Sequence, residues 1–172
     1  MHAIAFETMS FLIVEDSAHM RTILRTILAG FGCRRIFEAE DGADGLEKLD
    51  AVSPDLVIID WEMPVLSGPE MIRFIRNPDG FRHAFVPIIL LTAHTERNRM
   101  IQAKTFGVNE VLRKPVSPKA IYQRVASIML QPRPFLRTAT YFGPAPREEL
   151  RPTAKTGKPE LIDQRAGANS GA

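Results

Sequence analysis

Five side chains that could take part in chemistry stand at or near the ends of short apolar runs. Glu15 and Asp16 end the first run, Asp60 ends the third, Thr92 lies near the end of the fourth, and Lys114 near the end of the fifth. The run before Asp60 contains four consecutive apolar residues, as in a strand buried on both faces. A carboxylate there is costly unless something nearby needs its charge. Asp60 is therefore the first candidate for a functional residue.

The types of these side chains favour phosphoryl chemistry. If the three carboxylates lie together, each close pair repels by about 4 kcal/mol at an effective dielectric constant of about 20, and a divalent cation would neutralise them. Hard oxygen ligands favour Mg²⁺ over Zn²⁺. A threonine hydroxyl donates hydrogen bonds, and a lysine ammonium attracts anionic oxygens. These groups would suit the transfer of a phosphoryl group to Asp60, with Mg²⁺ and Lys114 stabilising the charge on its oxygens.

The apolar pattern predicts the elements that would position this site. Residues 1–130 contain five strand-length apolar runs that alternate with helical patterns. The predicted strands cover residues 11–16, 34–39, 56–60, 85–93 and 110–115, and the predicted helices cover residues 16–32, 41–52, 67–77, 96–106 and 117–130. This alternation predicts an α/β protein with a doubly wound parallel sheet. In the strand order 2-1-3-4-5, the first and third strands are neighbours, and ligands bind at their carboxyl ends.

Composition indicates one folded domain followed by a tail. The chain has 172 residues and is 45% hydrophobic, which is ordinary for a globular protein. We expect a cytoplasmic protein without a membrane segment, because no apolar run approaches the roughly 20 residues of a membrane span and no signal peptide is recognisable. Cys33 is the only cysteine, which excludes an internal disulfide and suits a reducing compartment. The four histidines show no zinc-ligand spacing.

The predicted domain covers residues 9–130, and residues 131–172 form a proline-rich, basic tail. The tail carries 7 basic and 4 acidic residues, a net charge of +3, and 6 of the 13 prolines. We assign it no regular structure and expect truncation after Leu130 to leave folding intact. Its aromatic and basic segment 133–143 either docks on the domain or on a partner, or is a disordered extension. A net charge of +3 over 42 residues is low for a segment that binds nucleic acid.

Five motifs in order carry a resemblance to a known family. They are "VED", "EAEDG", "PDLVIIDWEMPVLSG", "ILLTA" and "RKP", and the intervals between Asp16, Asp60, Thr92 and Lys114 are 44, 32 and 22 residues. The chain resembles the receiver domain of bacterial two-component response regulators, of the chemotaxis type, over about residues 9–130. The resemblance implies a flavodoxin-like (βα)5 three-layer sandwich. The tail resembles those of stand-alone receivers of alphaproteobacteria and includes no DNA-binding domain.

The resemblance also implies roles for the site residues. Asp60 would accept a phosphoryl group from a histidine kinase or histidine phosphotransfer protein. Asp16 and Glu15 would hold Mg²⁺ together with Asp60 and the backbone carbonyl of Glu62. In the same family pattern, the Thr92 hydroxyl would bond a phosphoryl oxygen. The Lys114 ammonium would pair with the phosphoryl group. The Lys114–Pro115 peptide bond is expected to be cis. The output would be contact with an unknown downstream protein.

Two positions depart from the family pattern. Glu15 stands where Asp is commoner, so an outer-shell role toward the metal is as open as direct coordination. Val111 stands where many members carry Tyr or Phe, so the coupling between Thr92 and an aromatic ring cannot operate in its familiar form. The face of the fourth helix, fifth strand and fifth helix stays the default partner surface. Glu62 and His94 occupy positions that influence the lifetime of the phosphate in the family.

Two other functional classes compete with this interpretation. An aspartyl-nucleophile phosphatase on a Rossmann-like sheet would prefer its nucleophile on the first strand, with a second aspartate two residues later. Here the candidate ends the third strand, and Glu62 stands two residues on. A nucleotide or flavin binder would need a glycine-rich phosphate loop after the first strand, where "VEDSAHM" stands instead.

Overall fold

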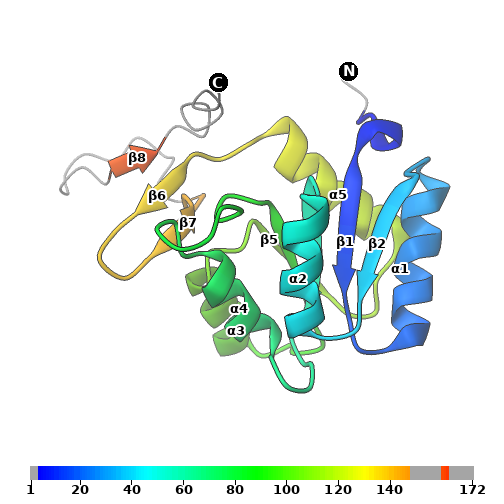
Figure 1. Ribbon diagram of the computed structural model, residues 1–172, viewed down its shortest axis with the longest axis horizontal. Helices are drawn as coiled ribbons and strands as arrows, with labels where there is room; N and C mark the ends of the chain where they lie inside the picture. The colour runs from blue at the N-terminus through cyan, green and yellow to red at the C-terminus, as the bar shows by residue number, and fades with distance from the viewer. Residues whose placement is uncertain (1–3, 148–159, 163–172) are drawn as a thin grey trace.

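A five-stranded parallel sheet with helices on both faces forms the body of the protein. We analysed a computed structural model that describes residues 4–147 and 160–162 (Figure 1). The elements of the body are β1 (Ser10–Val14), α1 (Ala18–Gly30), β2 (Arg35–Ala39), α2 (Gly42–Val52), β3 (Leu56–Asp60), α3 (Gly68–Ile75), β4 (Ile88–Thr92), α4 (Arg97–Thr105), β5 (Glu110–Arg113) and α5 (Pro118–Leu130). The sheet order is β2-β1-β3-β4-β5. The predicted fold class and strand order are confirmed.

The three central strands are buried on both faces. Every residue of β1, β3 and β4 is buried, which explains why these strands read as continuous apolar runs. In the parallel register, Val14 pairs with Ile59 and Asp60 pairs with Leu91. The carboxyl ends of β1, β3 and β4 are therefore brought to the same edge of the sheet.

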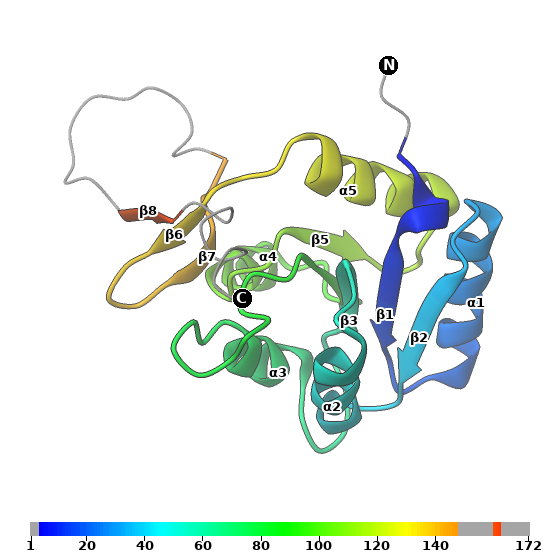
Figure 2. The same ribbon diagram turned by 45° about the horizontal axis from the view of Figure 1, so that its top comes forward.

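Two hydrophobic clusters form the layers on either side of the sheet. One contains residues of α1 and α5, such as Leu24 and Val125, and the other contains residues of α2, α3 and α4, such as Leu49, Ile72 and Ala103. Figure 2 shows the helices covering the two faces. In the part of the chain that the structure describes, no helix is both long and apolar enough to cross a membrane.

Polar side chains define where four of the helices begin. The Ser67 hydroxyl accepts a bond from the Glu70 amide, and the Glu70 carboxylate accepts one from the Ser67 amide, so the capping box expected at α3 is present. Ser17, Asp41 and Ser117 cap α1, α2 and α5 in the same general way. The β3–α3 connection is thereby anchored close to the end of β3.

The packed body begins before residue 9. Residues Phe6–Thr8 form a short 3₁₀ helix, and the Phe6 side chain is only 3% exposed. Its ring lies 4.9 Å from the ring of Phe31 and 5.9 Å from that of Tyr122. Phe6 therefore closes the end of the α1–α5 layer.

The tail contains regular structure that the sequence analysis does not assign. Strand β6 (Phe135–Arg137) pairs antiparallel with β7 (Phe142–Pro144) and with β8 (Glu160–Ile162), in the order β7-β6-β8. The absence of regular structure expected for residues 131–172 is therefore wrong for these three segments. Each strand has only three residues, too few to show an alternating pattern in the sequence.

The β6–β7 hairpin packs on the body of the protein. Phe135 and Phe142 are 0% and 9% exposed, and their rings lie 5.0 and 5.2 Å from the ring of Phe85. Gly143 approaches the backbone of Gly107 so closely that a Cβ on Gly143 would lie 2.5 Å from the Gly107 Cα. Figures 1 and 2 place the hairpin beside the loop that joins α4 to β5. Segment 133–143 thus docks on its own domain.

Truncation after Leu130 should destabilise the protein, contrary to the expectation from sequence. The truncated chain would lose three large buried apolar side chains, Phe135, Leu136 and Phe142, and would expose Phe85. Burial of each such side chain is worth about 1.5–3 kcal/mol, so we expect the free energy of unfolding to fall by at least about 3 kcal/mol. Urea denaturation of the two chains measures the difference. Equal unfolding free energies would contradict the docking of the hairpin.

Candidate phosphoryl site

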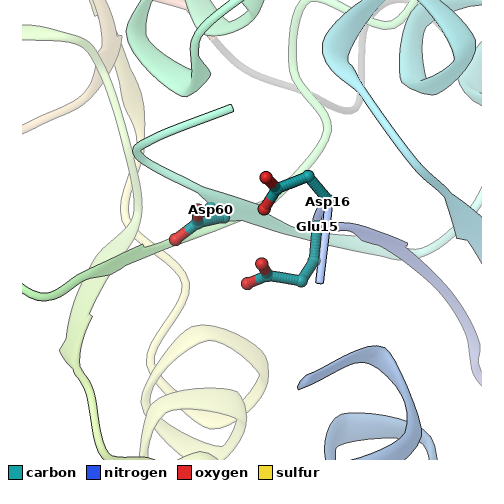
Figure 3. A group of neighbouring side chains, drawn as sticks. All are labelled: Glu15, Asp16 and Asp60. Atoms are coloured by element: carbon teal, nitrogen blue, oxygen red, sulfur yellow. The ribbon is translucent and has the colours of Figure 1, made fainter. Parts of the chain in front are cut away.

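Three carboxylates converge at the carboxyl ends of β1 and β3. Glu15 and Asp16 directly follow β1, and Asp60 is the last residue of β3. One oxygen from each carboxyl group lies within 4.8 Å of the others. Figure 3 shows the side chains of Glu15 and Asp16 extending toward the strand end that carries Asp60. Glu15 and Asp60 are buried, at 1% and 4% exposure, whereas Asp16 is exposed.

Lys114 joins two of these carboxylates. Its ammonium Nζ lies 2.8 Å from Oδ1 of Asp60 and donates a 2.9 Å hydrogen bond to Oε2 of Glu15. Burial acts to lower the pKa of Lys114, but hydrogen bonds to the two carboxylates outweigh it and raise the pKa. The ammonium therefore stays charged and occupies the place between the two acids.

Desolvation dominates the electrostatics of the buried acids. It raises the pKa of Asp60 despite the opposing ammonium of Lys114. It also raises the pKa of Glu15, and the negative charge of Asp60 acts in the same direction. One ammonium cannot neutralise three carboxylates, so the site retains an excess of negative charge that a cation would relieve.

The donor set fits Mg²⁺. Carboxylates from Glu15, Asp16 and Asp60 are hard oxygen ligands within a small space, and the described residues place no histidine or thiol among them. Because Oε2 of Glu15 is already bonded to Lys114, and Oε1 accepts a bond from the Ser17 amide, Glu15 is the most restrained of the three. Asp16 is the carboxylate most free to bind a cation directly.

Arg21 supports the loop that carries two of the acids, and the sequence analysis missed it. Its Nη1 donates hydrogen bonds of 2.8 and 3.1 Å to the backbone carbonyls of Glu15 and Asp16. Its Nη2 bonds the Glu40 carboxylate at 3.2 Å. The signal available in the sequence was an arginine one turn into the helix after the acidic pair. Its partners at the acidic pair are backbone atoms, which no residue pattern reveals.

Thr92 and Lys114 come together through the pairing of β4 and β5. Thr92 ends β4, one residue beyond the position opposite Asp60, and its carbonyl accepts a 2.9 Å bond from the Lys114 amide. The Thr92 side chain is fully buried, and its hydroxyl accepts a 3.0 Å bond from the His94 amide. The Lys114–Pro115 bond that follows is cis.

His94 and Glu62 meet at the rim of the site. Nε2 of His94 lies 2.9 Å from Oε1 of Glu62, within ion-pair distance if the imidazole is protonated. The His94 ring packs edge-on against Trp61, with the centroids 5.5 Å apart. The Glu62 side chain is exposed and belongs to this rim, so only its backbone carbonyl is a candidate for the cation.

Val111 lies on β5 opposite Leu90, at the half-buried edge of the second hydrophobic cluster. The same residue lines a hollow that Tyr141 of the hairpin also lines. A tail aromatic side chain thus lines the same hollow as the residue that departs from the expected family pattern.

Gly68 keeps the first turn of α3 against the end of β3. Its amide donates a 3.0 Å bond to the Trp61 carbonyl, and a Cβ on Gly68 would overlap the Asp60 carbonyl oxygen. We expect Gly68→Ala to reduce the free energy of unfolding by about 1–3 kcal/mol because the backbone must shift.

Gly30, at the end of α1, is the matched control for this substitution. A Cβ on Gly30 meets no atom within 4 Å. Gly30→Ala should be neutral or stabilising by up to about 1 kcal/mol, since alanine favours helix. Thermal unfolding of both variants decides the point, and equal effects would contradict the close contact at Gly68.

Comparison with known proteins agrees with this geometry. Residues 11–126 match the family of response regulator receiver domains. The chain is 33% identical over 122 residues to chemotaxis protein CheY1 of Helicobacter pylori, covering 70% of this chain and 97% of that protein. It is 31% identical over 120 residues to chemotaxis protein CheY of Pseudomonas aeruginosa, covering 70% and 95%.

A solved structure supports the same assignment. The chemotaxis response regulator CheY4 of Vibrio cholerae aligns with a TM-score of 0.64 at 28% identity, covering 71% of this chain and all of that one. The family match agrees with the strand order of the sheet and with the cluster of carboxylates at the carboxyl ends of its strands. The chain therefore belongs to the family of CheY-like response regulator receiver domains, the signalling phosphoacceptors of two-component systems.

Proposed function

We propose that this chain acts as a single-domain response regulator that accepts a phosphoryl group on Asp60. The observation that carries the proposal is the convergence of Glu15, Asp16 and Asp60 with the ammonium of Lys114. The phosphoryl donor would be a histidine kinase or a histidine phosphotransfer protein. The output would be a change of contacts with a downstream protein.

The chemistry of the transfer follows from the positions of two side chains. A carboxylate oxygen of Asp60 forms a bond to phosphorus while the phosphorus–nitrogen bond of the donor phosphohistidine breaks, and the electron pair returns to the imidazole nitrogen. Lys114, 2.8 Å from Asp60 Oδ1, is in place to pair with a phosphoryl oxygen as the new bond forms. When a phosphoryl oxygen takes the place of Asp60 as its partner, the Lys114 ammonium keeps its hydrogen bond to Glu15.

Two further side chains would assist. Thr92, beside Asp60 at the sheet edge, would donate its hydroxyl hydrogen to a phosphoryl oxygen, while its oxygen can still accept from the His94 amide. Asp16, Glu15, Asp60 and the Glu62 carbonyl would hold Mg²⁺. When bound, Mg²⁺ would neutralise charge on the carboxylates and on the phosphoryl oxygens.

The direct test is incubation of the full chain with acetyl phosphate in Mg²⁺, followed by mass spectrometry of the intact protein. One phosphoryl group per chain, mapped to Asp60 by reductive trapping of the acyl phosphate, is the expected result. Labelling of another residue would contradict the assignment.

Asp16→Ala should weaken Mg²⁺ binding by at least about tenfold, since it removes the most accessible of the three carboxylate ligands. Quenching of the fluorescence of Trp61, which directly follows Asp60, measures the titration. Glu47→Ala is the matched control, because Glu47 is an exposed acid on α2. If both variants titrate alike, the cation binds elsewhere.

The competing phosphatase function finds less support in the site. The residue two positions after Asp60, Glu62, faces His94 at the rim instead of joining the carboxylate cluster. A turnover assay with small phosphomonoesters separates the two functions. Release of many equivalents of phosphate per chain would favour the phosphatase, whereas a single labelled carboxylate favours the receiver.

A further inference from the structure

Arg21 holds the loop between β1 and α1, which carries the two acids that lie next to Asp60. Its Nη1 donates bonds of 2.8 and 3.1 Å to the backbone carbonyls of Glu15 and Asp16. These two carbonyls belong to the peptide groups on either side of the Asp16 Cα. Because each peptide group is planar, bonds to both of them restrain the two backbone dihedral angles that lie between them. Arg21 therefore sets the direction in which the Asp16 side chain leaves the backbone.

The carboxylate of Asp16 depends on this backbone restraint more than the other two acids do. The Glu15 carboxylate is held directly, because it accepts bonds from Lys114 and from the Ser17 amide. The Asp60 carboxylate is buried and pairs with Lys114. None of the described residues forms a hydrogen bond or an ion pair with the exposed carboxylate of Asp16. The position of this carboxylate is therefore controlled through its backbone.

The guanidinium of Arg21 is itself held by two acids at the end of β2. The side chain of Arg21 is 11% exposed, and its Nε lies 3.4 Å from Oε2 of Glu38, a residue of β2. Its Nη2 lies 3.2 Å from Oε1 of Glu40, just after the strand. The Glu38 carboxylate also pairs with Arg25, one turn later on α1. Arg21 thus links the end of β2 to the loop that follows β1.

We propose that Arg21 is a positioning residue for Mg²⁺, which acts through the backbone of the loop to hold the Asp16 carboxylate ready for the cation. This inference rests on the function proposed above and adds a residue to the site. Loss of a group that orients a metal ligand typically weakens metal binding by about 10–100-fold. Removal of the Arg21 guanidinium should have an effect of this kind although the three carboxylates remain.

The positive charge of Arg21 acts on a cation in the opposite direction. A guanidinium close to a site with an excess of negative charge offsets part of that charge and repels a cation. On Coulombic grounds alone, removal of the guanidinium would therefore strengthen the binding of Mg²⁺. Positioning predicts weaker binding after the same substitution. The sign of the change in Mg²⁺ affinity thus separates the two roles.

The test is a Mg²⁺ titration of the full chain, followed by the fluorescence of Trp61. Arg21→Met keeps an extended side chain but removes the charge and the donors, and we expect the dissociation constant of Mg²⁺ to rise by at least about tenfold. In phosphorylation by acetyl phosphate, the half-saturating Mg²⁺ concentration should rise in parallel, whereas the rate at saturating Mg²⁺ should change by less than about twofold. Circular dichroism without Mg²⁺ checks that the variant is folded. If it is not, Arg21→Lys replaces it: this variant keeps the charge, so weaker binding arises from the lost bonds and unchanged binding overturns the proposal.

Arg25→Met is the matched control, because it removes the same charge from the same helix. Arg25 pairs with the same Glu38 carboxylate, and its side chain bonds neither carbonyl of the loop. Its Mg²⁺ affinity should stay within about twofold of that of the unmodified chain, since an exposed charge is largely screened. Unchanged or tighter binding in Arg21→Met overturns the proposal, as does equal weakening in both variants. If the unmodified chain binds no Mg²⁺, the metal site proposed above fails too; if it binds Mg²⁺ and Arg21→Met binds it equally, only the present inference fails.

Discussion

Asp60→Asn should abolish phosphoryl transfer to the protein while leaving it folded. Asparagine keeps the shape of the buried side chain but lacks the anionic oxygen that attacks phosphorus. Asp60 is 4% exposed, and its Oδ1 pairs with Lys114, which keeps its bond to Glu15 in the variant. We expect no covalent phosphate by intact-mass measurement after incubation with acetyl phosphate and Mg²⁺.

Asp55→Asn provides the control within the same segment. Asp55 immediately precedes β3, at the opposite end of the strand from Asp60, and its carboxylate bonds the amide and hydroxyl of Ser10. This variant should take up phosphate as the unmodified chain does. Full labelling of Asp60→Asn would mean that another residue accepts the phosphoryl group.

Arg76→Ala should produce the largest loss of stability among the substitutions considered. Arg76 is 7% exposed and donates bonds of 2.7–2.8 Å to the carbonyls of Gly107, Ala84 and Val86. Its guanidinium also lies 5.0 Å from the centre of the Phe135 ring. Burial lowers the pKa of Arg76 to about 9, which leaves the side chain charged at neutral pH.

Removing this side chain leaves three buried carbonyls without their donor and opens a cavity under the hairpin. Each unsatisfied buried group costs about 1–3 kcal/mol, although relief of the buried charge offsets part of the loss. We expect the free energy of unfolding to fall by at least about 3 kcal/mol in urea denaturation. Arg73→Ala, one turn earlier on the exposed side of α3, should change it by less than about 0.5 kcal/mol. Similar losses in both variants would contradict the anchoring role of Arg76.

The fold of the body could be predicted because its signals are local and repeated. Fully buried strands such as β3 give continuous apolar runs, and the capping-box spacing of Ser67 and Glu70 indicates the start of α3. The acidic, hydroxyl and ammonium side chains could be assigned to one edge because parallel strands share the direction of their carboxyl ends. The sequence therefore predicted which residues meet, and the structure adds how Lys114 divides its contacts between Asp60 and Glu15.

The tail could not be predicted because its stabilising contacts are distant in sequence. In the sequence, Arg76 is one more charged residue of a surface helix. In the structure, it donates hydrogen bonds to carbonyls of two loops and lies over the ring of Phe135, 59 positions later. Phe142 and Gly143 lie in a proline-containing segment that has no helical or strand period. The same limitation applies to Arg21, whose partners at the candidate site are backbone atoms.

Helix α3 connects the candidate phosphoryl site with the hairpin of the tail. Its first residue, Gly68, lies against the carbonyl of Asp60 at the end of β3. Arg76, which caps its last turn, donates hydrogen bonds to carbonyls of the loops under the hairpin. Eight residues of α-helix make a stiff rod about 12 Å long. A displacement of the β3–α3 loop would therefore be transmitted along the helix to the hairpin at its other end, and a fluorine label on Tyr141 would report it.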